Sequence, residues 1–179
     1  MQDYARIIAK KYLLKPFLRS GLSANQITIL NFSLLGLLSI VLFFKGYFLL
    51  GLLVAGLVVL LDNVDGEVAR ATRGNTKQGE YLDTSLDWLY LMFLLFSISY
   101  ASGVLAWGTL AIIAITYGNW VQYNGKVNAW LPPYLGITPL LIFGIILQHA
   151  NYGIMAIAII QTIRTITLYW RSTWGIWKQ

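Results

Sequence analysis

Residues 61–87 read LDNVDGEVARATRGNTKQGEYLDTSLD and contain six of the seven acidic residues of the chain. Asp62 and Asp65 are three residues apart, so a helix would place both carboxylates on one face. Asp83 and Asp87 are four residues apart and would share a helical face in the same way. The segment between the two pairs is short, which predicts two antiparallel neighbouring helices whose acidic faces meet.

The rest of the chain is apolar, with 58% hydrophobic and 11% charged residues among 179. A soluble domain carries about 25% charged residues, so this composition indicates lipid as the main solvent. We expect an all-α integral membrane fold with six transmembrane helices. The hydrophobic runs place these helices at about 25–44, 47–61, 79–101, 104–123, 134–148 and 152–170, with the second continuing as helix to about residue 70.

An amphipathic segment at residues 1–22 precedes the six-helix domain of residues 23–179. Its apolar residues follow helical spacing among Lys and Arg residues, which is typical of a juxtamembrane helix lying on the membrane surface. Ser23 or Asn25 can cap the first span, because either side chain can accept a hydrogen bond from a free backbone N–H.

Basic residues predict the orientation of the chain in the membrane. In a six-span arrangement every Lys and Arg except Lys45 falls toward one side, so we expect both termini and the acidic hairpin on the cytoplasmic side. The formal charge of +6 then reflects contact with anionic membrane lipids, and no nucleic-acid partner is expected. Trp and Tyr residues near the span ends fit interfacial anchors better than platforms for stacking a base.

Four carboxylates that converge within a few ångströms need compensating positive charge. Two divalent cations would balance them, and all-oxygen ligation in a chain with no cysteine and one histidine favours Mg²⁺ or Mn²⁺ over Zn²⁺. Such a pair of ions suits phosphoryl chemistry, because it can neutralise a pyrophosphate. A solvated acidic loop is the alternative, and it leaves the helical phase of both pairs unexplained. Glu67 and Glu80 lie off these faces and are interpreted as solvated or cap-like charges.

The same stretch contains D-x2-D-G-x2-A-R-x8-G-x3-D-x3-D without a departure. This pattern resembles the signature of the CDP-alcohol phosphotransferases, membrane enzymes of phospholipid synthesis. The resemblance implies transfer of a phosphate-linked, phosphatidyl-type group from a CDP-alcohol, such as a CDP-lipid, to an acceptor alcohol, with release of CMP. It also implies that Asp62, Asp65, Asp83 and Asp87 bind two metal ions and that Asp87 acts as the general base.

The resemblance assigns the donor site as well. Gly66, Ala69 and Gly79 would form a close-packed nucleotide pocket, and Arg70 would hold the donor pyrophosphate; an anchor on the basic side is the alternative for Arg70. A homodimer is a further property carried over from the family. The family's Pro-Asn-x-x-Thr start of the first span appears here as residues 24–28, ANQIT, without the proline.

The acceptor is less constrained by the sequence. Arg164 lies inside the sixth span, where a charge usually faces a cavity or a partner. Lys126 follows the fourth span, and Arg73 and Lys77 lie in the short segment of the acidic hairpin. These residues could surround a phosphate, which would favour glycerol 3-phosphate or an inositol phosphate over serine. Alternatively, Lys126, Arg73 and Lys77 are ordinary topology residues and Arg164 extends to the interface. Four polar residues near the end of the fourth span could line an acceptor pocket or form hydrogen bonds between helices: Tyr117, Asn119, Gln122 and Asn124.

Three other functions compete with this interpretation. An intramembrane prenyltransferase also uses aspartates and Mg²⁺, but resembles a larger bundle with two separated acidic motifs. A divalent-cation transporter needs carboxylates near the bilayer midplane, on a path open to both sides. A non-catalytic membrane scaffold does not require the motif. Release of CMP from a CDP-lipid separates the enzyme from the transporter and the scaffold.

Overall fold

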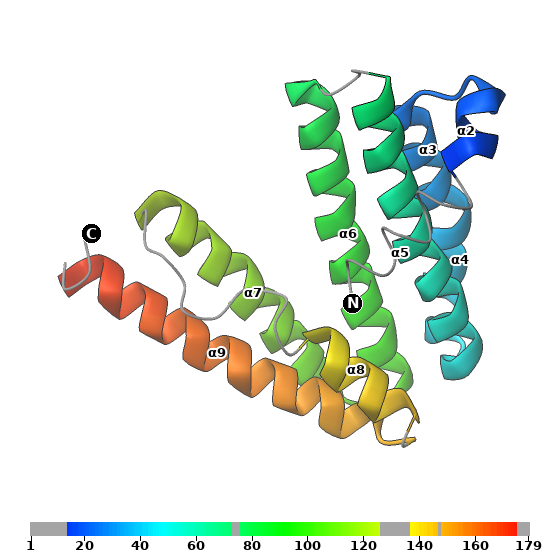
Figure 1. Cartoon of the computed structure of the whole chain (residues 1–179). Coiled ribbons are helices and arrows are strands. Elements are labelled where there is room, and N and C mark those ends of the chain that lie inside the picture. The colour runs from blue at the N-terminus through cyan, green and yellow to red at the C-terminus, as the bar shows by residue number, and fades with distance from the viewer. Residues whose placement is uncertain (1–13, 73–75, 126–136, 147, 175–179) are drawn as a thin grey trace. The chain divides into compact units, whose positions relative to one another are not determined.

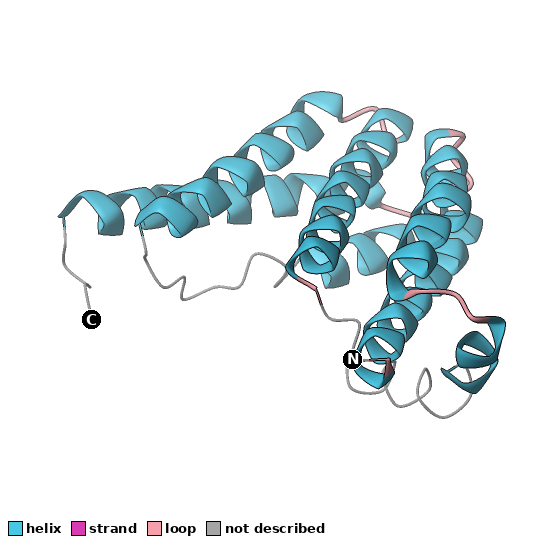
Figure 2. Cartoon of the chain, turned by 90° about the horizontal axis from the view of Figure 1, so that it is seen from above, coloured by secondary structure: helices cyan, strands magenta, loops and turns pink. Residues whose placement is uncertain are grey.

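The computed structural model of the chain describes residues 14–72, 76–125, 137–146 and 148–174. Every regular element in these ranges is a helix, as Figure 1 and Figure 2 show, so the prediction of an all-α chain is confirmed. The chain divides into two compact units, Met1–Leu94 and Leu95–Gln179.

The first unit is built around one long helix that changes its winding. Helix α3 is followed without a break by a π-helical segment, η2, and then by α4. Helix α5 packs against α2, α3, η2 and α4, and α6 runs beside α5 (Figure 1). The bounds are α2 Leu14–Ser20, α3 Ala24–Leu30, η2 Asn31–Gly36, α4 Leu37–Phe44, α5 Phe48–Ala71 and α6 Lys77–Ala101, whose last residues belong to the second unit.

Helix α3 begins at a capping box. The Ser23 side chain accepts a hydrogen bond from the Gln26 backbone N–H, and the Ser23 backbone N–H donates to Gln26 Oε1 at 2.9 Å. Of the two caps that the sequence offered, the structure therefore uses Ser23. Two reciprocal hydrogen bonds satisfy free N–H groups at this end of the helix. The helix therefore begins at Ala24 even though Ala24 stands where the Pro-Asn-x-x-Thr pattern has a proline.

A tight turn at Lys45 and Gly46 joins α4 to α5. Gly46 has a φ of 80°, a backbone conformation that glycine adopts at little cost. After the turn the two helices pack closely, because Gly51 of α5 faces the Phe43 ring, and a Cβ on Gly51 would lie 3.0 Å from that ring. Further along α5, the fully buried Val64 and Val68 pack with Ile27 of α3, which places the polar half of α5 against the start of the first long helix.

The second unit contains α7 (Leu105–Gly125), α8 (Ile137–Ile146) and α9 (Ala150–Trp174). Helix α9 packs against both α7 and α8. Glycines allow α8 and α9 to approach: a Cβ on Gly153 would lie 2.7 Å from the Leu140 carbonyl oxygen.

On length and composition, four helices of the described ranges could cross a membrane: Ala24–Phe44, Phe48–Ala71, Lys77–Ala101 and Ala150–Thr173. They correspond to the first, second, third and sixth predicted spans. Helix α7 has 21 residues, but its second half carries polar residues such as Asn119 and Gln122, and α8 has 10 residues. Part of the fifth predicted span, and residues 1–13 of the predicted amphipathic segment, lie outside the described residues. Six spans and the amphipathic helix therefore stay predictions.

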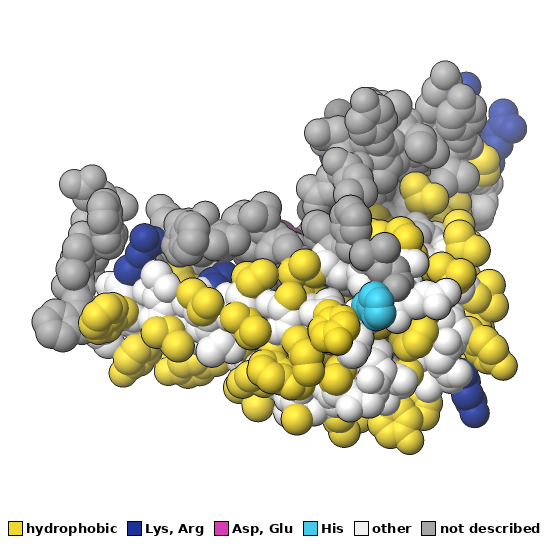
Figure 3. Space-filling view, turned by 90° about the horizontal axis from the view of Figure 1, so that it is seen from below, with side chains coloured by type: hydrophobic (Ala, Val, Ile, Leu, Met, Phe, Trp, Pro, Cys, Tyr) yellow, Lys and Arg dark blue, Asp and Glu magenta, His cyan; other side chains and the backbone are white. Residues whose placement is uncertain are grey.

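Hydrophobic side chains lie on the outside of the helices. Leu49 and Leu53 of α5 are 65% and 69% exposed, and Figure 3 shows one face on which many hydrophobic side chains are at the surface. Such side chains are costly in water and favourable in hydrocarbon, which fits helices that face lipid.

Candidate functional site

Three aspartates of the acidic hairpin come together in the first unit. One carboxylate oxygen each of Asp62 on α5 and of Asp83 and Asp87 on α6 lie within 4.8 Å of one another. The predicted meeting of the two acidic faces is therefore present in the structure. Carboxylates this close repel one another unless a cation lies between them. The Oδ1 atom of Asp83 is also buried and has no hydrogen-bond partner among the described residues, so it is available to such a cation.

The fourth aspartate of the motif is held by a hydroxyl group. Asp65 is 3% exposed, and its Oδ2 accepts a hydrogen bond from Thr28 Oγ1 of α3 at 2.6 Å. It lies outside the group of three converging carboxylates, but it lines a cavity together with Asp83. Thr28 therefore fixes the direction in which the Asp65 carboxylate points.

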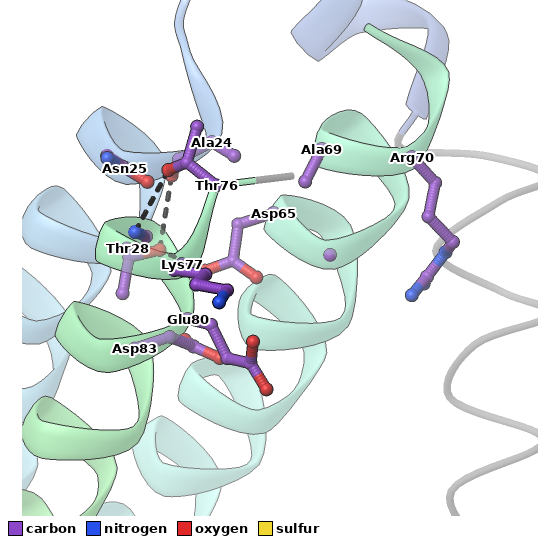
Figure 4. A pocket seen from close by; sticks show the side chains of 12 residues that line it. Ala24, Asn25, Thr28, Asp65, Ala69, Arg70, Thr76, Lys77, Glu80 and Asp83 are labelled. Atoms are coloured by element: carbon purple, nitrogen blue, oxygen red, sulfur yellow. Dashed lines mark hydrogen bonds between the residues drawn. The ribbon is translucent and has the colours of Figure 1, made fainter. Parts of the chain in front are cut away.

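This cavity has a volume of about 420 Å³ and lies among α3, α5 and the start of α6 (Figure 4). The predicted nucleotide-binding residues Gly66, Ala69, Arg70 and Gly79 all line it. The full lining consists of Ala24, Asn25, Thr28, Asp65, Gly66, Ala69, Arg70, Thr76, Lys77, Gly79, Glu80 and Asp83. A space of this size, with carboxylates and cationic side chains at its wall, can hold a small polar ligand.

Gly79 lies against a neighbouring helix. A Cβ at this position would lie 2.8 Å from Asn25 Oδ1, so any larger residue here needs the exposed Asn25 side chain to move away from the start of α6. The Gly79 backbone N–H donates to Thr76 Oγ1 at 3.1 Å, which satisfies one of the free N–H groups at the beginning of α6.

Arg70 is engaged with an acid of its own helix. Its Nη2 lies 2.9 Å from Glu67 Oε1, and the two side chains are 48% and 7% exposed. The interpretation of Glu67 as a solvated or cap-like charge is therefore wrong. Residues three apart on a helix are neighbours, and this spacing pairs Glu67 with Arg70 and turns its carboxylate inward. In Figure 4, Arg70 lies apart from the side chains grouped around Asp65.

Two of the lining residues that were not predicted as site residues, Asn25 and Thr28, are polar residues of α3. Asn25 was considered only as a cap, and Thr28 only as part of the ANQIT pattern at the start of the first span. They are three residues apart and share a face of α3, so their spacing carried the same signal as the spacing of Asp62 and Asp65. The partner for that face could not be read from the local sequence.

In the second unit, Arg164 of α9 is buried among polar side chains of α7. It is 1% exposed, and its Nη2 donates to Gln122 Oε1 at 2.7 Å and to Asn119 Oδ1 at 3.1 Å. The alternative that Arg164 extends to the interface is therefore wrong, and hydrogen bonding between helices is confirmed for Asn119 and Gln122. Lys126 lies outside the described residues.

Comparison with known proteins gives a consistent picture. The family model for CDP-alcohol phosphatidyltransferase matches residues 22–171. An archaetidylinositol phosphate synthase of Pyrococcus horikoshii is 34% identical over 87 residues, which cover 49% of this chain and 45% of that protein. A bifunctional IPC transferase and DIPP synthase of Aquifex aeolicus is 40% identical over 74 residues, which cover 41% of this chain and 17% of that protein. The matches thus span less than half of either curated relative.

Solved structures share the fold. The phosphatidylinositol phosphate synthase of Mycobacterium tuberculosis with CDP-DAG bound has a TM-score of 0.78 at 17% identity, covering 98% of both chains. The same protein in complex with manganese and citrate has a TM-score of 0.77 at 17% identity, covering 98% of this chain and 93% of that one.

Proposed function

Because the chain belongs to the CDP-alcohol phosphatidyltransferase family, we propose that it transfers a phosphate-linked group from a CDP-alcohol to an acceptor alcohol and releases CMP. The observation that carries the proposal is the convergence of Asp62, Asp83 and Asp87 beside a cavity lined by Gly66 and Gly79. In this reaction the acceptor oxygen forms a bond to the phosphorus next to the donor's alcohol. The bond from that phosphorus to the bridging oxygen breaks, and CMP leaves with this oxygen.

As a member of a metal-dependent family, the protein uses divalent cations, with Mg²⁺ or Mn²⁺ preferred by an all-oxygen site. Asp62, Asp83 and Asp87 would hold them together with Asp65, whose carboxylate Thr28 orients. When bound, two such ions neutralise the pyrophosphate charge and stabilise the leaving phosphate. The unpartnered Oδ1 of Asp83 supports this assignment.

The donor nucleotide would occupy the 420 Å³ cavity. Gly66, Ala69 and Gly79 keep its wall free of large side chains, so that a flat base and a ribose can approach the backbone. Arg70 would hold a pyrophosphate oxygen, either by turning from Glu67 or while remaining paired with it. The apolar outer face of α5 would leave the lipid tail of a CDP-lipid in the bilayer while its headgroup reaches the aspartates.

Asp87 would act as the general base. It belongs to the acidic cluster and lies one helical turn after Asp83 on α6. In the transfer it would take the proton of the acceptor hydroxyl as the oxygen attacks phosphorus.

A phosphorylated acceptor is the version of this reaction that we favour. The P. horikoshii and M. tuberculosis proteins are named as synthases of inositol phosphate lipids, which supports an inositol phosphate over glycerol 3-phosphate. Arg164 and Lys126 are the candidate residues for the acceptor phosphate. The burial of the Arg164 charge in a membrane-spanning helix supports a functional role, because such charges usually serve a site.

The membrane setting completes the proposal. The protein is an integral membrane protein, and we propose that its active site and both termini lie on the cytoplasmic side and that it works as a homodimer. In the six-span arrangement every Lys and Arg except Lys45 falls toward the same side. This imbalance supports a cytoplasmic location for that side, because basic residues are kept on the cytoplasmic face of a membrane.

The test is a transfer assay with the purified full chain. Ester- and ether-linked CDP-lipids are combined with inositol 1-phosphate, glycerol 3-phosphate or serine in Mg²⁺ or Mn²⁺, and released CMP is measured. CMP that requires both donor and acceptor, and disappears with a chelator, is the expected result. A folded protein that releases no CMP with any pair would contradict the proposal.

A further inference from the structure

Asn31 is a buried polar residue in the middle of the first long helix, and the function proposed above does not use it. It begins the π-helical segment η2 and is 7% exposed. Its Nδ2 donates to the Val58 carbonyl oxygen of α5 at 2.9 Å. A carbonyl only accepts hydrogen bonds, so this contact settles the orientation of the amide, and Oδ1 faces away from Val58.

The Oδ1 atom of Asn31 is buried and has no hydrogen-bond partner in the described part of the chain. Buried amide oxygens are usually paired, either with a protein donor or with an ordered water molecule. An orphaned oxygen inside a helix that faces lipid is especially costly, because hydrocarbon supplies no donor.

A small cavity supplies the space for a partner. It has a volume of about 20 Å³, and its polar lining consists of Thr28, Asn31, Asp62, Asp87 and Tyr90. A cavity needs about 10–15 Å³ of such volume to hold one water molecule. The cavity therefore has room for a single water beside two of the aspartates.

The hydroxyl groups around the cavity have already used their protons. Thr28 donates to Asp65 at 2.6 Å. Ser39 donates to the Gly36 carbonyl at 2.8 Å, so in its 2.9 Å contact with Tyr90 the tyrosine is the donor. The polar atoms left for a guest are therefore oxygen acceptors.

Water fits these acceptors because it brings two donors. A divalent cation would also bind oxygen ligands, but Ca²⁺ needs about six to eight of them and Mg²⁺ needs six in an octahedron. The rest of the cavity wall consists of the apolar residues Phe32, Val58 and Leu86, so it supplies too few oxygen ligands for either ion.

We propose that this cavity holds one ordered water molecule that donates to Asn31 Oδ1 and to a carboxylate oxygen of Asp62 or Asp87. Asn31 is then a positioning residue for the metal-binding carboxylates Asp62 or Asp87, through this water. The hydrogen bond from Asn31 Nδ2 to the Val58 carbonyl reaches the same part of α5, because Val58 lies one helical turn before Asp62. The role as a positioning residue rests on the proposed function, whereas the water site does not.

The experiment compares two asparagines. Asn31→Leu keeps a similar volume and removes both polar atoms. Asn63→Leu is the matched control, because Asn63 lies next to Asp62 and its Nδ2 donates at 2.7 Å to the Val59 carbonyl on the exposed side of α5. The dissociation constant of Mn²⁺ is measured by electron paramagnetic resonance on the purified full chain. Loss of a group that orients metal ligands costs about 10–100-fold in metal affinity, so this increase is expected for Asn31→Leu and none for Asn63→Leu.

A direct observation does not depend on any variant. A high-resolution crystal structure of the unaltered protein is expected to show one water between Asn31 Oδ1 and a carboxylate of Asp62 or Asp87. A dry cavity, a cation in it, or a protein donor on Oδ1 overturns the proposal, as does an Asn31→Leu protein that binds Mn²⁺ as tightly as the control. If the unaltered protein holds this water and binds Mn²⁺ but releases no CMP, the proposed transfer fails and the water site stands.

Discussion

The Thr28 hydroxyl shows how one side chain of the first long helix serves the acidic hairpin. Its 2.6 Å hydrogen bond to Asp65 has the short length typical of bonds to a charged acceptor. Without it the Asp65 carboxylate could rotate away from the cavity that it shares with Asp83. A ligand that must be reoriented before it binds a cation binds that cation more weakly.

Thr28→Val removes the hydroxyl and keeps the shape of the side chain. We expect the Mn²⁺ concentration for half-maximal CMP release to rise about 10–100-fold, and Thr28→Ser to restore most of the loss. Thr109→Val is the control, because the exposed Thr109 hydroxyl donates to the Leu105 carbonyl of its own helix at 2.9 Å and not to another helix of the described ranges. Equal metal dependence of the Thr28→Val and Thr109→Val proteins would show that Thr28 does not orient Asp65.

Gly79→Ala tests the close approach of α6 to α3. The new Cβ would lie 2.8 Å from Oδ1 of the exposed Asn25 side chain, which can turn aside, so we expect a cost at the low end of the about 1–3 kcal/mol typical of overpacking. Gly56→Ala is the control, since nothing lies within 4 Å of the Cβ position there. Thermal unfolding in detergent should rank Gly79→Ala below the unaltered protein and Gly56→Ala at or above it; the reverse order contradicts the predicted contact.

Asp87→Asn tests the general base. Loss of a base typically lowers the rate about 10²–10⁴-fold, so we expect kcat for CMP release to fall by this factor. Ser85→Ala, an exposed position between Asp83 and Asp87 on the same helix, should leave kcat unchanged. An Asp87→Asn protein with normal kcat excludes the base role.

At the scale of the elements, the first long helix contacts both helices of the acidic hairpin. Thr28 and Asn31 bond to α5, whereas Ser39 lies on α4 and contacts Tyr90 of α6. The π-helical segment η2 begins at Asn31 and ends before Ser39, and it winds more widely than an α-helix, which changes the direction of the residues that follow it.

The Ser39–Tyr90 contact can be measured by a double-mutant cycle. Ser39→Ala leaves the partly buried Tyr90 hydroxyl without its acceptor and should cost at most about 1–3 kcal/mol of unfolding free energy. Tyr90→Phe should cost less, because Ser39 still donates to the Gly36 carbonyl. The double variant should then be less destabilised than the sum of the two. Additive costs would mean that α4 and α6 are not coupled through this pair.

The local periodicity of the sequence was enough to predict the acidic hairpin, because the spacing of Asp62, Asp83 and Asp87 is a property of single helices. The ion pair of Glu67 with Arg70 also follows from the spacing of two residues on one helix, but Glu67 was interpreted instead as a solvated charge. By contrast, the contact of Asn31 with Val58 depends on how two helices pack, and no spacing in the sequence indicates it. The sequence could not decide whether Arg164 is buried for the same reason, because its hydrogen-bond partners lie more than forty residues away in the chain.

At the scale of the whole molecule, the orientation in the membrane follows from the side on which basic residues gather. Lys45 lies in the turn between α4 and α5, and Lys15 lies in α2. Both are exposed, and the chain contains no cysteine, so a substituted thiol at either position would be unique.

We expect a membrane-impermeant maleimide to label Lys45→Cys in intact cells and to label Lys15→Cys only after the membrane is opened. The reason is that translocating basic residues is disfavoured, so the basic side stays in the cytoplasm. Activity of both variants serves as the check that they are folded. Labelling of Lys15→Cys in intact cells would reverse the proposed orientation.

The wide turn at η2 also limits how this chain can vary in length. A π-turn contains one residue more than the α-turn it replaces, so loss of one residue within η2 would convert it to an α-turn and would leave the residues that follow in nearly the same helical phase. Loss of one residue from α3 or α4, by contrast, would rotate everything after it by about 100° and would separate Thr28 and Ser39 from their partners on different helices. Loops tolerate insertions and deletions, whereas this helix should tolerate a one-residue deletion only at η2 and should also accept exchanges at exposed positions such as Leu34.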